Sequence, residues 1–158
     1  MSGREGVTPA DPERAAVLEV VHRLREVALR LELAASAFAK ETGLHATDVR
    51  ALIRLLDAER GGVEATPSWL AKQLGMTSQA TTAVLHRLVA AGHVERVRSP
   101  SDGRSTHLRV SAEAVDLGWT FFGTLLDRLV DATQALTPDE RAAVTKYLDA
   151  VTTAVQAD

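Results

Sequence analysis

The stretch that decides the fold is TPSWLAKQLGMTSQATTAVLHRLVAAGHVERV, residues 66–97. Its opening threonine and proline are typical of a helix start, and Gly75 is typical of a helix end. Thr77 or Ser78 then begins a second helix, which ends near Gly92. Two helices separated by so short a turn predict a helix-turn-helix, in which the second helix lies in the major groove of DNA.

The second helix carries small polar side chains in its first turns, and Arg87 lies one to two turns further on. Glutamine can read adenine, and hydroxyl groups can reach bases or phosphates. Taken alone, these polar residues are also typical of the cap and exposed face of an ordinary helix. The DNA contacts that we predict on this helix are Ser78, Gln79, Thr81, Thr82 and, for a phosphate, Arg87.

A change of period after this helix predicts a β-hairpin, with strands at 93–98 and 107–110. Residues 100–103 are typical of a turn, which projects Arg104 toward the narrow and negative minor groove. Asp102 is explained equally well as a turn residue or as a carboxylate that orients Arg104.

Basic side chains support this interpretation of the hairpin as a wing. Arg96 and Arg98 share one strand face, and Arg109 faces out while Leu108 and Val110 pack inward. Residues 66–110 contain six basic and two acidic residues, a charge of +4 within a chain of −3. A basic segment in an acidic chain suits a polyanion-binding surface, although charge alone is equally explained by a solvated segment.

Long helices on both sides of this segment complete a mainly α fold with a small β-hairpin wing. We expect a flexible tail at 1–11, dimerisation helices at 12–44 and 112–158, and a winged helix-turn-helix lobe at 45–111 within a single domain. Two apolar stripes favour a homodimer built from these helices. The stripes are Val17, Val21, Leu24, Ala28, Leu31, Ala35 and Phe38 in the first helix, and Val144, Leu148, Val151 and Val155 in the last.

The segment LAKQLGMTSQATTAVLHRLVAAGHVERVRSPSDGRSTHLRVS, residues 70–111, resembles the winged helix-turn-helix of the MarR (multiple antibiotic resistance regulator) family. With the flanking helices, the resemblance covers roughly residues 12–157. It implies a homodimeric transcriptional regulator, usually a repressor, on a pseudo-palindromic operator in double-stranded DNA. It also implies contacts from the five residues of the second helix named above and from Arg104. Gly103 departs from the family, because many relatives carry a second basic residue there.

The resemblance further implies an effector pocket where the dimer helices meet the DNA-binding lobe, with small aromatic acids as effectors. The candidate residues for this pocket are His22, Arg25, His45, Trp119 and Phe122. A tryptophan at helical spacing is more often part of the core, and histidines are more often surface or hydrogen-bonded residues.

Other functions are disfavoured by what the sequence lacks. It has no cysteine, no phosphate-binding glycine loop, no His-Glu-x-x-His motif and no histidines at metal-ligand spacing. We therefore expect no enzyme activity, no metal, no cofactor, no membrane span and a cytoplasmic location. The alternative function is a winged helix that binds a protein without specific DNA binding. The polar residues that follow Thr77 favour DNA.

Overall fold

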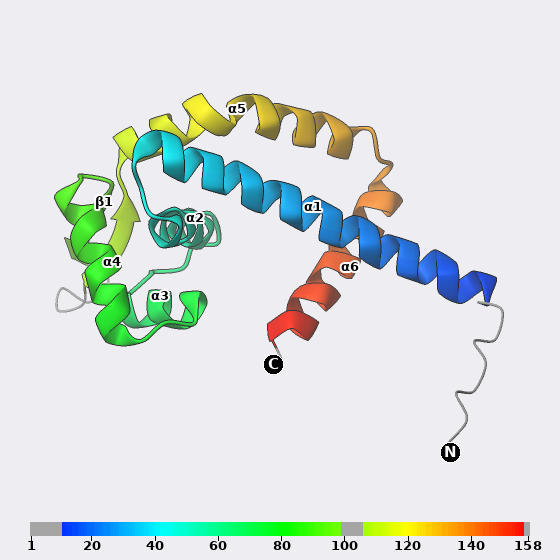
Figure 1. Ribbon diagram of the computed structural model, residues 1–158, viewed down its shortest axis with the longest axis horizontal. Coiled ribbons are helices and arrows are strands. Elements are labelled where there is room, and N and C mark those ends of the chain that lie inside the picture. Colours follow the sequence, from blue (N-terminus) through cyan, green and yellow to red (C-terminus); the bar gives the residue numbers. More distant parts are fainter. Residues whose placement is uncertain (1–10, 99–105, 157–158) are drawn as a thin grey trace, which may run out of the picture. The chain divides into compact units, whose positions relative to one another are not determined.

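The computed structural model describes residues 11–98 and 106–156 (Figure 1). These residues form six helices and one antiparallel hairpin, which confirms a mainly α fold with a small β wing. The elements are α1 (Pro12–Thr42), α2 (Ala46–Arg60), α3 (Pro67–Leu74), α4 (Ser78–Ala90), β1 (Val94–Arg98), β2 (Thr106–Val110), α5 (Ala112–Gln134) and α6 (Pro138–Gln156).

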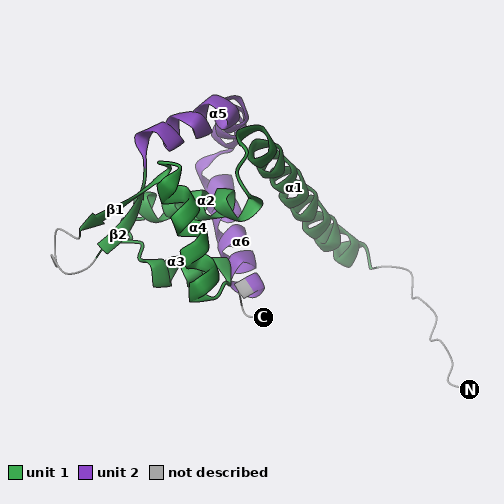
Figure 2. Ribbon diagram, turned by 60° about the vertical axis from the view of Figure 1, so that its left-hand side comes forward, with its two compact units in different colours: residues 1–110 green, residues 111–158 purple. Residues whose placement is uncertain are grey.

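Two compact units make up the chain (Figure 2). The first covers residues 1–110, in which the C-terminal end of α1 packs on α2 and the hairpin lies beside α2 and α4. The second covers residues 111–158 and holds α5 and α6. The division into a lobe at 45–111 and dimerisation helices on either side stays a prediction.

The helices begin and end at the residues that local chemistry favours. Asp11, which we placed in the tail, caps α1, because its Oδ1 accepts a 3.1 Å hydrogen bond from the Glu13 amide. Gly43 ends α1 and Gly75 ends α3, each in the left-handed conformation, with φ of 73° and 62°. That conformation costs glycine little, so both helices end where the sequence predicts.

The core of the first unit lies where α2, α3 and α4 meet (Figure 1). Leu55 on α2, Leu70 on α3 and Leu85 and Leu88 on α4 are fully buried. Burying side chains of this size is the main favourable term in folding, so these leucines hold the three helices as one lobe.

The hairpin is attached to this lobe by backbone donors of β2. The Leu108 amide donates to the Ala65 carbonyl at 2.7 Å, and the Val110 amide donates to Oε1 of Glu59 at 3.1 Å. Leu108 and Val110 are both buried, which confirms that they pack inward. The hairpin is therefore fixed to α2 at the end next to α5.

The second unit has its own helix starts. The Ser111 side chain accepts a hydrogen bond from the Ala114 amide at 3.2 Å and so caps α5. The Thr137 amide donates to Oε2 of Glu140 at 2.8 Å, and the Glu140 amide donates to Oγ1 of Thr137 at 3.3 Å. Hydrogen bonding of the Glu140 carboxylate to Thr137, first to its backbone amide and then to its side chain, lowers the pKa of Glu140. The reciprocal hydrogen bonds between Thr137 and Glu140 form a capping box that begins α6.

The long helices keep much apolar surface exposed. In α1 only Phe38 and Ala39 are buried, and in α5 only Ala114 is buried. None of the described helices combines the length and the apolar character of a membrane span. The exposed large apolar residues are Val17, Leu18, Val20, Val21, Val27, Leu29, Leu31 and Leu33 on α1, and Trp119, Leu126, Leu129, Val130, Val144, Leu148 and Val155 on α5 and α6.

Candidate nucleic-acid interface

The N-terminus of α4 is built by a tight turn and a threonine cap. After Gly75, the Met76 amide donates to the Ala71 carbonyl at 3.0 Å, which closes the turn. Oγ1 of Thr77 then accepts a 3.2 Å hydrogen bond from the Ala80 amide. The cap fixes the residue at which the helix begins, and with it the face on which each later side chain lies.

The exposed face of α4 starts with three of the predicted residues. The side chains of Ser78, Gln79 and Thr82 are exposed. Oγ1 of Thr82 donates to the Ser78 carbonyl at 2.8 Å, so the oxygen of this hydroxyl is left as an acceptor. The structure therefore brings together an amide and two hydroxyl groups at the start of one helix.

Thr81 does not lie on this face. Its side chain is 1% exposed, and its hydroxyl donates to the Thr77 carbonyl at 3.0 Å. It packs on the side of α4 that carries Val84, Leu85 and Leu88. The prediction that Thr81 contacts DNA is therefore wrong, because the residue belongs to the core of the lobe.

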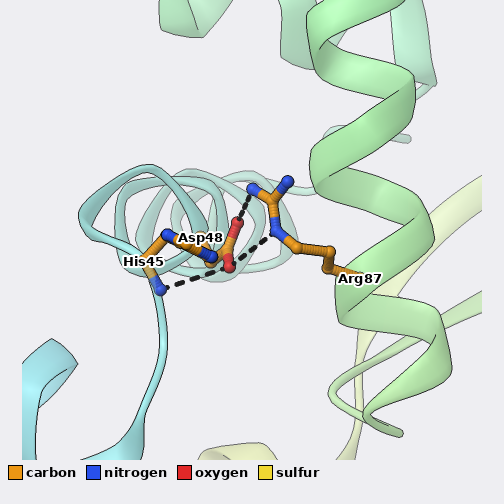
Figure 3. A network of polar contacts seen from close by, with 3 residues as sticks. All are labelled: His45, Asp48 and Arg87. Carbon is orange, nitrogen blue, oxygen red and sulfur yellow. Dashed lines mark hydrogen bonds and ion pairs between the residues drawn. The ribbon is translucent and has the colours of Figure 1, made fainter.

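Arg87 has a partner within the protein that the sequence does not indicate. Nε of Arg87 donates to Oδ2 of Asp48 at 3.2 Å, and Nη2 lies 2.5 Å from Oδ1 (Figure 3). Asp48 is 2% exposed, whereas the Arg87 side chain is 41% exposed. Arg87 therefore forms a two-point ion pair with a buried carboxylate, and its contact with a phosphate stays a prediction.

The charge state of this arginine follows from the same contact. The hydrogen bond to the Asp48 carboxylate raises the pKa of Arg87, burial lowers it, and the Coulombic attraction of Asp48 raises it further. The contact with Asp48 therefore favours the charged form of the guanidinium.

The register of the hairpin places its arginines on two faces. Arg96 lies opposite Leu108, and Arg98 lies opposite Thr106. The two arginines therefore share one face of β1 with the buried Val94. Arg109 lies opposite Glu95 on the other face. All three arginines are exposed, which leaves Arg96 and Arg98 available as wing residues.

Arg109 is close to two carboxylates. Its Nε lies 4.0 Å from Oε1 of Glu59, and Glu95 faces it across the ladder. Neighbouring carboxylates offset its charge, so Arg109 adds less to the positive surface than the sequence count suggests. Arg104 and Asp102, the predicted tip contact and its support, lie outside the described residues.

The exposed side of α4 also carries His86, which was not among the predicted contacts. His86 is exposed and lies two helical turns after Gln79, so both side chains lie on the same side of the helix. The seven-residue spacing was the signal that could have found it. Between Ala65 and Val94 the chain contains no aspartate or glutamate, so this surface has no carboxylate of its own.

The candidate effector residues fall on separate units. His22, Arg25 and His45 belong to the first unit and are exposed. Trp119 and Phe122 belong to the second, where Trp119 is exposed and the Phe122 ring meets that of Phe121 edge to face at 4.8 Å. Two surface pockets are lined by other residues, one beside Glu59, His107 and Arg109 and one beside Leu129, Val130 and Arg141.

The described residues include no cluster of metal-ligating side chains. Within residues 11–98 and 106–156, no three histidine, aspartate or glutamate side chains lie close enough to hold a metal ion.

The segment that contains this surface is similar to a known protein family. Residues 42–105 match the model of the MarR family. Over these residues the chain is similar to the MarR family. The matched segment begins at the last residue of α1 and contains α2, α3, α4 and β1. No curated protein matches the chain.

Solved structures resemble this chain well beyond the matched segment. The S. aureus MepR–DNA complex has a TM-score of 0.57 at 14% identity, with 85% of this chain and 95% of that chain covered. S. aureus MepR bound to ethidium bromide has a TM-score of 0.55 at 14% identity, with the same coverage. The transcriptional regulator Tm0710 from Thermotoga maritima has a TM-score of 0.58 at 17% identity, with 88% and 95% covered. At these identities the likeness shows the fold.

The buried and exposed threonines of α4 allow a direct test of this face. We expect Thr81→Ala to lower the free energy of unfolding by about 1.5 kcal/mol, because it removes a buried methyl group and a satisfied hydroxyl. Thr82→Ala should change it by no more than about 0.5 kcal/mol, since that side chain is exposed. Urea denaturation of both variants makes the comparison, and equal losses would contradict the assignment of Thr81 to the core.

Proposed function

We propose that this protein is a sequence-specific DNA-binding transcriptional regulator that represses from a pseudo-palindromic operator. One observation carries the proposal: in a MarR-family segment, α4 buries one side in the lobe and exposes a polar, carboxylate-free side. A helix held this way can enter the major groove and offer its side chains to base edges. The DNA complex of the similarly folded MepR is consistent with this use of the fold.

Each exposed side chain has a part in the proposed interface. Gln79 reads a base edge by two hydrogen bonds, and Ser78 and Thr82 contact bases or phosphates. Arg104 enters the minor groove from the wing. Asp102, Arg96 and Arg98 support it there, the two arginines through their positive charge.

A winged helix that binds a protein without DNA is the less favoured function. A protein-binding surface is depleted in charge at its centre and rich in aromatic side chains. The exposed side of α4 begins instead with Ser78, Gln79 and Thr82, followed by His86. We also propose that the protein is not an enzyme and acts in the cytoplasm, as expected of a regulator that binds DNA.

The DNA contact of Gln79 can be tested on two kinds of duplex. One is a random-sequence duplex about three helical turns long, and the other is the duplex that the wild-type protein enriches from a random pool. Gln79→Ala should weaken binding to the enriched duplex by about 1–3 kcal/mol, because a bidentate base contact is lost. It should leave the salt dependence unchanged because glutamine is neutral, whereas Arg104→Ala should lower that slope by about 0.9 per phosphate contact.

The control for this experiment is Gln134→Ala, which removes an exposed glutamine in the second unit. It should bind both duplexes as the wild type does. A wild-type protein that is folded but shows no DNA binding at low salt would contradict the proposed function. Equal losses from Gln79→Ala on both duplexes would contradict base reading.

We also propose a two-fold homodimer formed by the long helices. The helices α1, α5 and α6 each expose several large apolar side chains, and exposed apolar surface can mark a site of protein association. A second copy of the chain is the partner that offers the same surfaces, and closed two-fold pairing lets each patch cover its counterpart. Such a dimer would also place two α4 helices on successive turns of DNA.

Light scattering at micromolar concentration tests the dimer, which should show twice the 16.9 kDa mass of one chain. Leu148→Glu should shift the protein toward monomer, because it places a charge in the apolar stripe of α6. Thr153→Glu adds the same charge on the other side of α6 and should leave the dimer intact. A monomeric wild-type protein would overturn the dimer.

The final element of the proposed function is a small aromatic effector that releases the protein from DNA. Similarly folded MepR has been solved with ethidium bromide bound. On α1, His22 and Arg25 lie three residues apart and are exposed, so they can share a face and contact one carboxylate. Trp119 and Phe122, also three apart, give α5 two aromatic rings.

Thermal denaturation with benzoate and salicylate tests the effector. A ligand at about 100 times its dissociation constant should raise the melting temperature by roughly 5–10 °C. Cyclohexanecarboxylate, which lacks the aromatic ring, should have a smaller effect. Arg25→Gln should lose the response, while Arg23→Gln, which removes an exposed partner of Glu19, should keep it. No shift with either aromatic acid would count against an aromatic-acid effector.

A further inference from the structure

The ion pair between Asp48 and Arg87 links two distant parts of the first unit. Asp48 is the third residue of α2, and Arg87 lies in the second half of α4, 39 residues later in the chain. Figure 3 shows the guanidinium reaching from α4 to the start of α2, where both of its contacts end on one carboxylate. The pair therefore joins α4 to the segment that follows α1.

Asp48 is itself held in place by the backbone. The His45 amide donates to Oδ2 of Asp48 at 3.3 Å, and the same oxygen accepts the Nε hydrogen of Arg87 (Figure 3). One carboxylate oxygen thus caps the start of α2 and receives the arginine of α4. The carboxylate that binds Arg87 is thus also hydrogen-bonded to the backbone at the start of α2.

The burial of the two partners is unequal, and this decides how the pair behaves near DNA. Asp48 is almost fully buried, whereas the Arg87 side chain is two-fifths exposed at the edge of the exposed side of α4. Leaving a buried carboxylate without its partner costs more than a solvated phosphate contact returns. Asp48 therefore outcompetes a phosphate for this guanidinium.

We infer that Asp48 is a positioning residue of the DNA interface: it fixes α4 to the start of α2 through Arg87 and withholds that guanidinium from the phosphate backbone. The inference rests on the proposed DNA binding. In this inference Arg87 orients α4. The contacts with bases and phosphates are made by other exposed residues of α4 and of the wing. Sequence discrimination then depends on a residue that touches no DNA.

Asp48→Asn tests this inference, because the amide keeps an oxygen for the His45 amide and removes the charge that holds Arg87. On the random-sequence duplex, the slope of log affinity against log salt should steepen by about 0.9 for each Arg87 that reaches a phosphate. The ratio of affinities for enriched and random duplexes should fall, because α4 has lost its anchor. Arg87→Gln should leave the slope unchanged and lower the same ratio, and the double variant should restore the wild-type slope.

Asp57→Asn is the matched control. It removes the same charge from the same helix and frees an arginine, because Asp57 pairs with Arg60 at 3.2 Å while both side chains are exposed. Neither the slope nor the ratio should change. Urea denaturation shows that each variant is folded before its binding is compared.

A measurement on the wild-type protein keeps the inference testable if the Asp48 variant fails to fold. The ¹H–¹⁵N signal of Arg87 Nε should stay at its position when random-sequence duplex is added at low salt. Movement of that signal, a flatter slope for Arg87→Gln, or an unchanged slope for folded Asp48→Asn would overturn the inference. Absence of wild-type DNA binding would instead defeat the proposed function, and the inference with it.

Discussion

Burial of one side of α4 against α2 and α3 is the constraint on which the rest of the candidate interface depends. Leu85 and Leu88 fill the lobe together with Leu55 and Leu70, and Thr81 joins them on the same side of the helix. A helix that must bury this side can present only the remaining one to a partner. The cap at its N-terminus then determines the residue at which that exposed side begins. The packing of α4 thus determines which of its side chains are available to contact DNA.

Local charge matters more for this surface than the net charge of −3. Between Ala65 and Val94 the sequence has no carboxylate, so nothing on α3 or α4 repels a phosphate. On the hairpin, Arg109 is offset by nearby Glu59, and this leaves its neighbours on β1 as the more effective charges. A count of basic residues along the chain overstates the positive potential of this surface. Arg109 on the hairpin and Arg87 on α4 each lie near a carboxylate, which offsets part of their charge.

The boundaries of the elements could be predicted from the sequence because local chemistry sets them. Thr77 caps a helix and Gly75 ends one through hydrogen bonds and backbone angles that depend on residues next to them. The surroundings of two site residues could not be predicted, for different reasons. Thr81 was grouped with its polar neighbours. It follows Gln79 by two residues, however, and this turns its side chain to nearly the opposite side of the helix. The partner of Arg87 lies 39 residues away, and only the packing of α2 against α4 brings them together.

The two parts of the chain meet different physical demands. The lobe closes a core of its own, whereas α1 buries only Phe38 and Ala39 over 31 residues and leaves its apolar stripe to be covered. A partner chain that covers the long helices would also fix the distance between the two copies of α4. Under the proposed function, the spacing of operator half-sites is then a property of the helices outside the lobe. Base preference is a property of α4 and of the contact at Asp48 that holds it. Changes in one part can therefore alter what the protein binds without altering the other.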